Sequence, residues 1–323
     1  MPRIAAGLPS WNGLLERLER RAGVPTEDLL PLDRGELLRR ELGGSVGDEV
    51  VAELGRADRY AVTHATLAAL GCTEVVTTNY DALYELAAAD AYQRPVTVLP
   101  GGAVEPGTPW VLKMHGDVAR PESIVLSRSD VVTYDALSRP VSSAVQALML
   151  TRHLLVVGAS MTDDNFLRLA HEVTAFRERD PRTGDDDGAP PIGTVVTLSP
   201  KPAQERLWEG RFRYLTMSDG ATGAERARHL AIFLDLVAML ATSRDRYLLD
   251  PRYEGMLTSR AERDAAATAR SLAAAVDGLP REGRVAWRAL REQLARLGAR
   301  PADPRADVGG SGQAVPHGTS AEA

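Results

Sequence analysis

Cysteine is almost absent from this sequence of 323 residues, and that absence excludes several kinds of protein. Cys72 is the only cysteine, so the chain can form neither an internal disulfide nor a structural zinc site built from several thiolates. No apolar run approaches the ~18 residues that span a bilayer. The start of the chain also lacks the basic segment and apolar stretch of a secretion signal. We therefore expect a cytoplasmic protein without zinc and without membrane contact.

Dense positive charge is also missing. The formal net charge is −6 and no compact run of Lys and Arg occurs, so nothing attracts a phosphate backbone over a long range, and nucleic acid is not the expected partner. The composition is otherwise that of a soluble globular protein, with 44% hydrophobic and 25% charged residues. A chain of this length can bury a large core, in one large domain with an appendage or in two modest domains.

The hydrophobic pattern changes character near Gly71. Before it, from about residue 10 to 70, apolar residues recur at helical spacing and predict scaffold helices. After it, short apolar runs alternate with amphipathic stretches, which predicts an α/β fold with a doubly wound, mostly parallel, Rossmann-like sheet covered by helices on both faces. The predicted strands are 74–77, 96–99, 110–114, 124–126, 154–157, 194–198 and 213–216, and the predicted helices among them are 82–89, 141–151, 166–176 and 224–241.

The composition also predicts the domain boundaries. Residues 1–245 are expected to form the nucleotide-binding domain, 246–300 an Ala- and Arg-rich helical extension, and 301–323 a disordered tail. We expect the extension to pack as a helical pair on the domain. The alternative is that it mediates assembly of a homo-oligomer or contacts an activating partner protein, which an exposed surface of Leu272, Leu279 and Leu290 would favour.

Polar residues follow three of the predicted strands, where parallel sheets bind ligands. After 74–77 come Thr78, Asn79, Tyr80 and Asp81 at a strand-to-helix corner that could hold a ribose or phosphate. The alternative is that Asn79 or Asp81 only caps the next helix.

The strand at 110–114 is followed by His115, Gly116 and Asp117. Histidine transfers protons near neutral pH, and glycine allows a sharp turn and close approach of a ligand. A lone histidine at a strand end is more often structural, so this motif gains weight only beside the others.

The strand at 154–157 leads into Gly158, Ala159 and Ser160, a small-residue turn that could admit a nucleotide. Asp163 or Asp164 could equally be the N-cap of the following helix. Since all three clusters fall at carboxyl ends of strands in one predicted sheet, their convergence indicates a binding site.

These motifs resemble the sirtuin-like (silent information regulator) family, and more closely its divergent bacterial branch associated with NAD hydrolysis in anti-phage defence. Residues 77–81 resemble that branch's Thr-Thr-Asn-Tyr-Asp motif, and His115-Gly116 resembles the strand-end His-Gly of the catalytic base. Residues 157–160 are similar to the Gly-Thr/Tyr-Ser turn beside the nicotinamide-side ribose. The segment 7–11 resembles the loop that covers the cofactor, with Trp11 as a lid. The resemblance covers about residues 7–242.

The resemblance implies NAD as substrate and a reaction that releases nicotinamide and ADP-ribose. His115 would relay a proton, Asn79 would position water or ribose, and Asp81 would hold the nicotinamide-side geometry. The cofactor-binding residues that it implies are Pro9, Trp11, Thr77, Thr78, Gly158, Ser160, Asp163, Asn165 and Ser199. The alternative is a non-catalytic sensor or scaffold protein that binds NAD or ADP-ribose without cleaving it.

Two family features are missing from the sequence. The Gly-Ala-Gly-x-Ser loop that cradles the pyrophosphate does not precede the segment 7–11; we expect a start codon assigned too late, with a truncated protein as the alternative. The four-cysteine zinc module of protein-deacylating sirtuins is absent as well, so NAD-dependent protein deacylation is the less expected activity.

Overall fold

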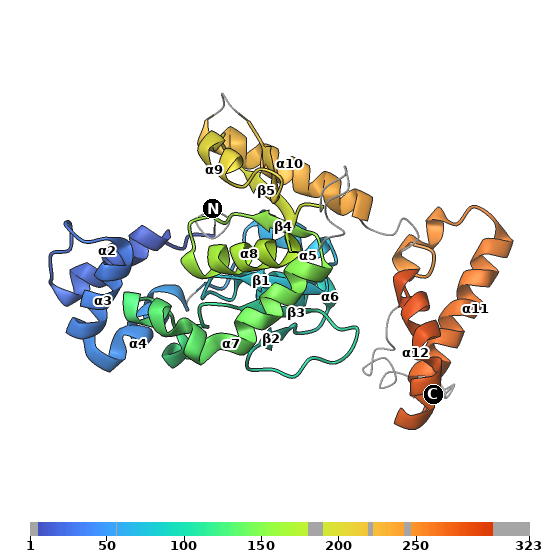
Figure 1. The fold of residues 1–323 in the computed structure, drawn as a ribbon. Coiled ribbons are helices and arrows are strands. Elements are labelled where there is room, and N and C mark those ends of the chain that lie inside the picture. Colours follow the sequence, from blue (N-terminus) through green and yellow to red (C-terminus); the bar gives the residue numbers. More distant parts are fainter. Residues whose placement is uncertain (1–5, 56, 180–189, 219–221, 242–246, 300–323) are drawn as a thin grey trace, which may run out of the picture. The chain divides into compact units, whose positions relative to one another are not determined.

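The structure is a computed structural model, and it describes residues 6–55, 57–179, 190–218, 222–241 and 247–299. The chain divides into two compact units, one ending at Ala241 and the other beginning at Thr242 (Figure 1). The predicted disordered tail, 301–323, lies outside the described residues. No helix among the described residues has the length and apolar character needed to cross a membrane.

Parallel strands form the centre of the first unit. They make two sheets of three strands each, in the orders β1-β3-β2 and β4-β5-β6, and every neighbouring pair is parallel. The predicted α/β class is confirmed, but the described residues form two sheets where we expected one. The strands are β1 (Glu74–Thr77), β2 (Thr97–Leu99), β3 (Trp110–Lys113), β4 (Leu154–Val157), β5 (Gly193–Thr197) and β6 (Phe212–Thr216).

The division into two sheets follows from the pairing of β1 and β4. Each of these strands is hydrogen-bonded to a neighbour on one side only, β1 to β3 and β4 to β5. The described residues contain no strand that joins them. The two edges still belong to one hydrophobic core, because Val76 of β1 and Val156 of β4 both pack against it.

The strand predicted at 124–126 is wrong. These residues pair with no strand in the described part of the chain. The Val125 amide instead donates to the His115 carbonyl (2.9 Å), and the Val125 carbonyl accepts from the Tyr80 hydroxyl (2.6 Å). Leu126 is buried in a hydrophobic cluster and the half-buried Ile124 packs against it. Three apolar residues in a row cannot distinguish such a loop from a strand.

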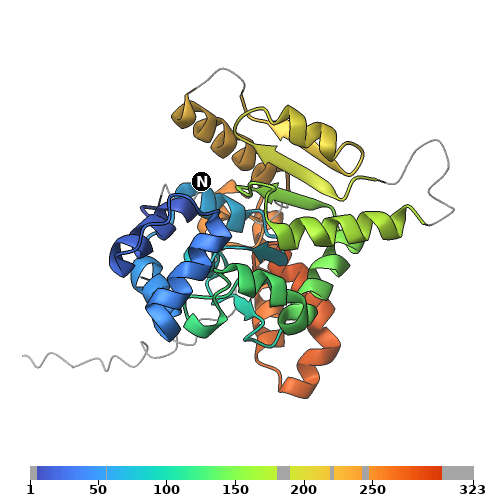
Figure 2. The same ribbon diagram turned by 60° about the vertical axis from the view of Figure 1, so that its left-hand side comes forward.

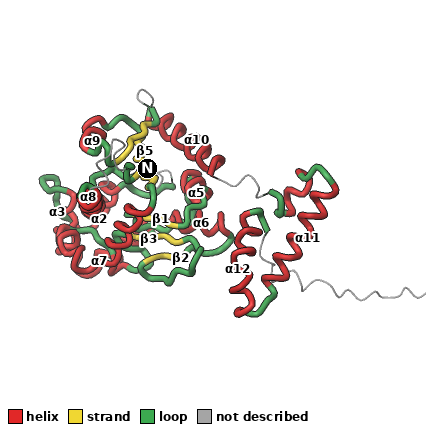
Figure 3. The backbone as a smooth tube through the Cα atoms, turned by 45° about the vertical axis from the view of Figure 1, so that its right-hand side comes forward, coloured by secondary structure: helices red, strands yellow, loops and turns green. Residues whose placement is uncertain are grey.

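Helices cover both faces of the sheets, as Figure 3 shows for α7 and α8 on one side and α5, α6 and α10 on the other. The largest buried cluster contains Met149 of α7, Leu169 of α8 and Val195 of β5. The helices of this unit are α2 (Trp11–Ala22), α3 (Pro31–Leu42), α4 (Val46–Leu54), α5 (Val62–Ala69), α6 (Leu83–Tyr92), α7 (Arg128–Thr151), α8 (Asp164–Arg177), α9 (Pro202–Leu207) and α10 (Gly223–Ala241), with short 3-10 turns at Gly43–Ser45 and Pro121–Ser123.

Local sequence signals begin and end several helices. Ser10 begins α2 by accepting a hydrogen bond from the Gly13 amide (3.1 Å), and Gly23 ends it with φ of 68°. Helix α7 begins at a capping box formed by Ser127 and Asp130. It starts well before the predicted residue 141, because Pro140 kinks the helix without ending it.

The carboxyl-terminal unit contains α11 (Arg260–Asp277) and α12 (Arg281–Arg296), preceded by a 3-10 turn at Pro251–Met256. Leu249, Ala273 and Leu294 belong to its own small core. Two hydrogen bonds from Arg291 to Asp277, of 2.7 and 2.8 Å, link the helices. Exposure of three leucines of this unit would favour a partner-binding surface. Leu272 and Leu290 are exposed, and Leu279 is half-buried.

Candidate functional site

The first part of the candidate site is the corner between β1 and α6. Asn79 is half-buried, and its backbone amide donates to the Thr77 hydroxyl (3.1 Å), which turns the chain out of the strand. Asp81 is buried and one of its oxygens accepts from the Leu83 amide (3.3 Å). The N-cap of α6 is Ala82, without a side-chain cap hydrogen bond, so neither Asn79 nor Asp81 is the cap that the alternative proposed. The bond to the Leu83 amide holds the Asp81 side chain against the start of the helix.

The second part is the end of β3, which lies in register with the first. Thr77 pairs with Lys113, so Asn79 and His115 each lie two residues beyond that last pair of the parallel ladder. Gly116 then adopts φ of 98°, a backbone conformation that favours glycine. The sheet thus places Asn79, the predicted positioning residue, and His115, the predicted proton-transfer residue, at the carboxyl ends of two neighbouring strands.

His115 is buried and held from two sides. Its Nε2 atom lies 3.3 Å from an oxygen of Asp163, which comes from the start of α8. The ring of Tyr134 meets the imidazole edge-on, with 6.1 Å between the ring centroids, and the Tyr134 hydroxyl donates to the Met114 carbonyl (2.8 Å). A carboxylate beside one ring nitrogen fixes the orientation of an imidazole and stabilises its protonated form.

Asp163 has two structural roles, because it also caps α8 by accepting from the Phe166 amide (2.8 Å). Burial alone would raise the pKa of Asp163, but hydrogen bonding and charge interaction with His115, together with the amides at the start of α8, lower it below the ordinary value. The carboxylate is thus kept ionised. The sequence left open which acid would cap this helix, and it is Asp163.

Replacing Asp163 with Asn tests that charge without removing the cap, since Asn is an equally good N-cap. A carboxyl group whose pKa is lowered by folding stabilises the fold above its unfolded pKa, and this contribution disappears as the pH falls through the folded pKa. We expect Asp163→Asn to cost about 0.5–1 kcal/mol at neutral pH. The difference from the unsubstituted protein should vanish well below the ordinary value of 3.8. Urea unfolding across pH measures this, and a constant difference at every pH would contradict it.

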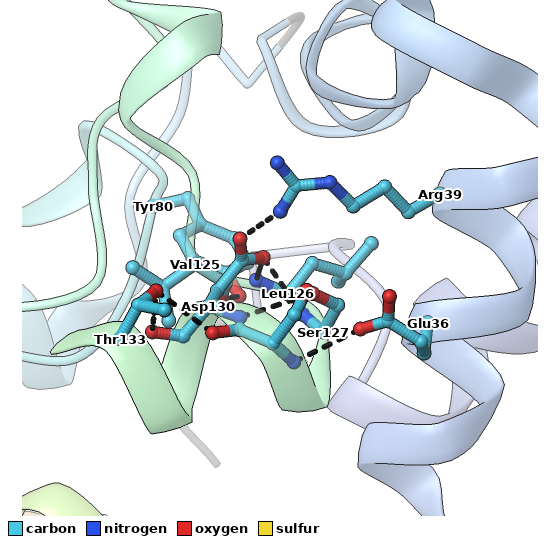
Figure 4. Close-up of polar contacts among 9 residues, drawn as sticks. Glu36, Arg39, Tyr80, Val125, Leu126, Ser127, Asp130 and Thr133 are labelled. Atoms are coloured by element: carbon cyan, nitrogen blue, oxygen red, sulfur yellow. Dashed lines mark hydrogen bonds and ion pairs between the residues drawn. The ribbon is translucent and has the colours of Figure 1, made fainter.

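The loop that follows Gly116 is held at its far end, where it enters α7, by contacts with α3 and α7 that Figure 4 shows. Asp130 of α7 accepts from the amides of Leu126 (3.0 Å) and Ser127 (2.9 Å) and pairs with Arg39 of α3. Glu36 of α3 accepts from the Ser129 amide (2.9 Å). Figure 2 shows the blue helices α2 to α4 beside the amino-terminal part of α7. These helices therefore support the loop that follows His115.

The other residues predicted to contact the cofactor lie in several different surroundings. Trp11 is the first residue of α2. The centroid of its ring lies 6.1 Å from that of Tyr80, the residue that follows Asn79 in the sequence. Ser160 is exposed and hydrogen-bonds Thr162 (2.6 Å). Of the remaining residues, Pro9 and Asn165 are buried, Thr77, Thr78 and Ser199 are half-buried, and Gly158 is exposed.

Sequence reasoning missed Lys113 as a residue of this region. Its side chain is buried, although it belongs to a strand whose other residues are apolar. A lysine inside an apolar strand is itself a signal, because such a charge is buried only where it has partners. No group of three or more potential metal ligands occurs in the part of the chain that the structure describes.

Comparison with known proteins identifies this region. Residues 73–212, which run from the start of β1 to the start of β6, match the family model of the SIR2-like domain. The match confirms the resemblance to the sirtuin-like family, and the chain carries a SIR2-like domain. The matched segment includes Asn79, His115 and Asp163.

Curated relatives share part of the same region. The NAD(+) hydrolase ThsA of Bacillus cereus (strain MSX-D12) is 28% identical over 193 residues, which cover 55% of this chain and 39% of the relative. The NAD(+) hydrolase ThsA of Enterococcus faecium is 29% identical over 181 residues, covering 53% of this chain and 37% of the relative. The ThsA of Acinetobacter baumannii (strain 532279) is 23% identical over 184 residues, with coverage of 55% and 38%. The chain thus spans less than two fifths of the length of these relatives, to which it is distantly homologous.

Proposed function

We propose that this chain, which carries a SIR2-like domain distantly homologous to ThsA NAD(+) hydrolases, hydrolyses NAD to nicotinamide and ADP-ribose. The observation that carries the proposal is the arrangement at the shared edge of β1 and β3. Asn79 and His115 leave the sheet in register there, and Asp163 lies 3.3 Å from the His115 ring. A role in anti-phage defence is the biological setting that the resemblance suggests for this reaction.

The chemistry would proceed by breaking the bond between C1′ of the ribose and the nicotinamide nitrogen. Nicotinamide leaves with the bonding electron pair, and a water oxygen bonds to C1′. Asn79 would hold the water or the ribose in position, and His115 would accept the proton that the attacking water loses. Asp163 would keep the imidazole oriented and stabilise it once it is protonated. Asp81 would act indirectly, by fixing the corner that carries Asn79.

The test is chromatographic detection of nicotinamide after the purified chain is incubated with NAD. We expect release by the unsubstituted chain and a loss of about 100-fold or more in Asn79→Ala, because a side chain that orients the reacting groups is removed. Gln293→Ala is the matched control, since it removes an exposed amide in α12.

Two outcomes of this test would contradict parts of the proposal. Equal release by Asn79→Ala and the control would remove Asn79 from the mechanism. Binding of NAD without any release of nicotinamide, measured by calorimetry, would refute hydrolysis and support the non-catalytic NAD-binding alternative.

A further inference from the structure

Lys113 is a charged side chain in the interior of the first unit, with 1% of its surface exposed. Its ammonium group contacts four oxygen atoms. The carbonyls of Tyr80 and Asp81 accept from Nζ at 3.0 and 2.9 Å. An oxygen of Asp117 lies at 3.1 Å and an oxygen of Glu85 at 2.7 Å. Burying an ammonium ion is costly unless it is paired and hydrogen-bonded. The ammonium group of Lys113 meets both conditions.

These four oxygens come from the segments that surround the candidate site. The two carbonyls follow Asn79 at the corner after β1, and Asp117 follows His115 and Gly116 after β3. Glu85 lies in the first turn of α6. A single ammonium group therefore joins both strand ends at one point.

We propose that Lys113 is a positioning residue for NAD cleavage, which fixes the Asn79 corner and the His115 turn relative to each other. The inference rests on the proposed function. Lys113 contacts neither of these two side chains through the bonds described above. It acts through the neighbouring residues of each segment, by binding the carbonyls of Tyr80 and Asp81 after Asn79 and the carboxylate of Asp117 after His115.

The neighbouring carboxyl groups explain why the positive charge is needed. Burial raises the pKa of Glu85 even though Lys113 opposes this, and Asp117 is buried as well. Without the ammonium group, the two carbonyls would lose their buried donor, and Glu85 and Asp117 would lose the cation between them. The corner and the turn would then move apart, and misplacement by about 1 Å can cost 100-fold in rate.

The test compares Lys113→Met with a matched control in the full chain. Methionine keeps a long apolar side chain and removes the charge. Arg34→Met makes the same kind of change at another well-shielded ion pair, since Arg34 of α3 lies 2.6 Å from Glu19 of α2 and its hydrogen bonds go to Glu19 and Thr26. Both variants should unfold at a lower temperature. At a temperature where both are folded, we expect Lys113→Met to lower kcat for nicotinamide release at least about 10-fold, with KM for NAD changed by less than about 3-fold. Arg34→Met should keep both values.

Hydrogen exchange gives a second readout that needs no activity. Lys113→Met should accelerate amide exchange in residues 79–83 and 115–119, and Arg34→Met should not. A folded Lys113→Met protein with unchanged kcat, or with unchanged exchange in these segments, would overturn the proposal. If the unsubstituted chain released no nicotinamide, the proposed hydrolysis would fail, and so would the catalytic part of this inference. The exchange experiment would still decide whether Lys113 fixes the two segments.

Discussion

Replacing His115 with Ala is expected to reduce the release of nicotinamide from NAD by about 10²–10⁴-fold, the usual contribution of a positioned general base. The expectation follows from its place beside Asp163 at the end of β3, because alanine has no side-chain group that can accept a proton from water. Chromatography of nicotinamide under saturating NAD measures the effect on kcat directly.

The control for this experiment is another histidine of the same unit. His153 lies just before β4, at the opposite end of the strands, and is exposed; its ring contacts the Thr194 hydroxyl (2.9 Å). His153→Ala should keep the activity of the unsubstituted chain. His115→Gln, which retains much of the buried volume, separates a loss of chemistry from a loss of packing. Activity within a few-fold of normal in a folded His115→Ala protein would rule out the assigned role.

Replacing Gly116 with Ala should lower the free energy of unfolding by about 3 kcal/mol or more. A Cβ atom there would lie 2.2 Å from the Ser123 carbonyl oxygen and 2.8 Å from the Ile124 Cα atom, and both are backbone atoms. The φ of 98° is in addition unfavourable for any residue with a side chain. The turn and the 3-10 segment that follows it would both have to move. Urea unfolding followed by circular dichroism measures the change.

Gly223→Ala provides the comparison, because a Cβ atom at the first residue of α10 meets no atom within 4 Å. We expect its stability to change by no more than about 0.5 kcal/mol. Should Gly116→Ala prove as stable as Gly223→Ala, the tight approach of Gly116 to Ser123 would not exist in solution.

The strand ends were predictable from the sequence because an apolar run followed by polar residues is a local pattern. Parallel strands then place such ends at one edge of a sheet. The polar clusters that contain Asn79 and His115 are predicted on this basis, while the roles of these two residues follow from the resemblance to the sirtuin-like family. The structure brings both residues out in register. The pairing of Asp163 with His115 was not predictable, since it joins the end of β3 to the start of α8 across 48 residues and depends on how these elements pack.

Other features depend on packing in the same way. The apolar residues 124–126 have the composition of a strand, but no neighbouring strand in the described residues pairs with them. Their hydrogen-bond partners are Tyr80, His115, Pro121 and Asp130. Lys113 gave a local signal that had no interpretation without its acceptors, which lie on three different segments. Sequence pattern identifies the elements, while long-range contacts decide what a buried charge or a short apolar run does.

Within the described residues, β1 and β4 each have a hydrogen-bonded neighbour on one side only, and such edges bear on aggregation. Unpaired backbone groups at a sheet edge can recruit a strand from another molecule. Each of these edges is only four residues long. An ion pair of 3.1 Å between Glu74, the first residue of β1, and Arg152, just before β4, places two charges at their amino-terminal ends. Short edges and nearby charges both oppose intermolecular strand pairing. We therefore expect these edges of β1 and β4 to resist fibril-like association.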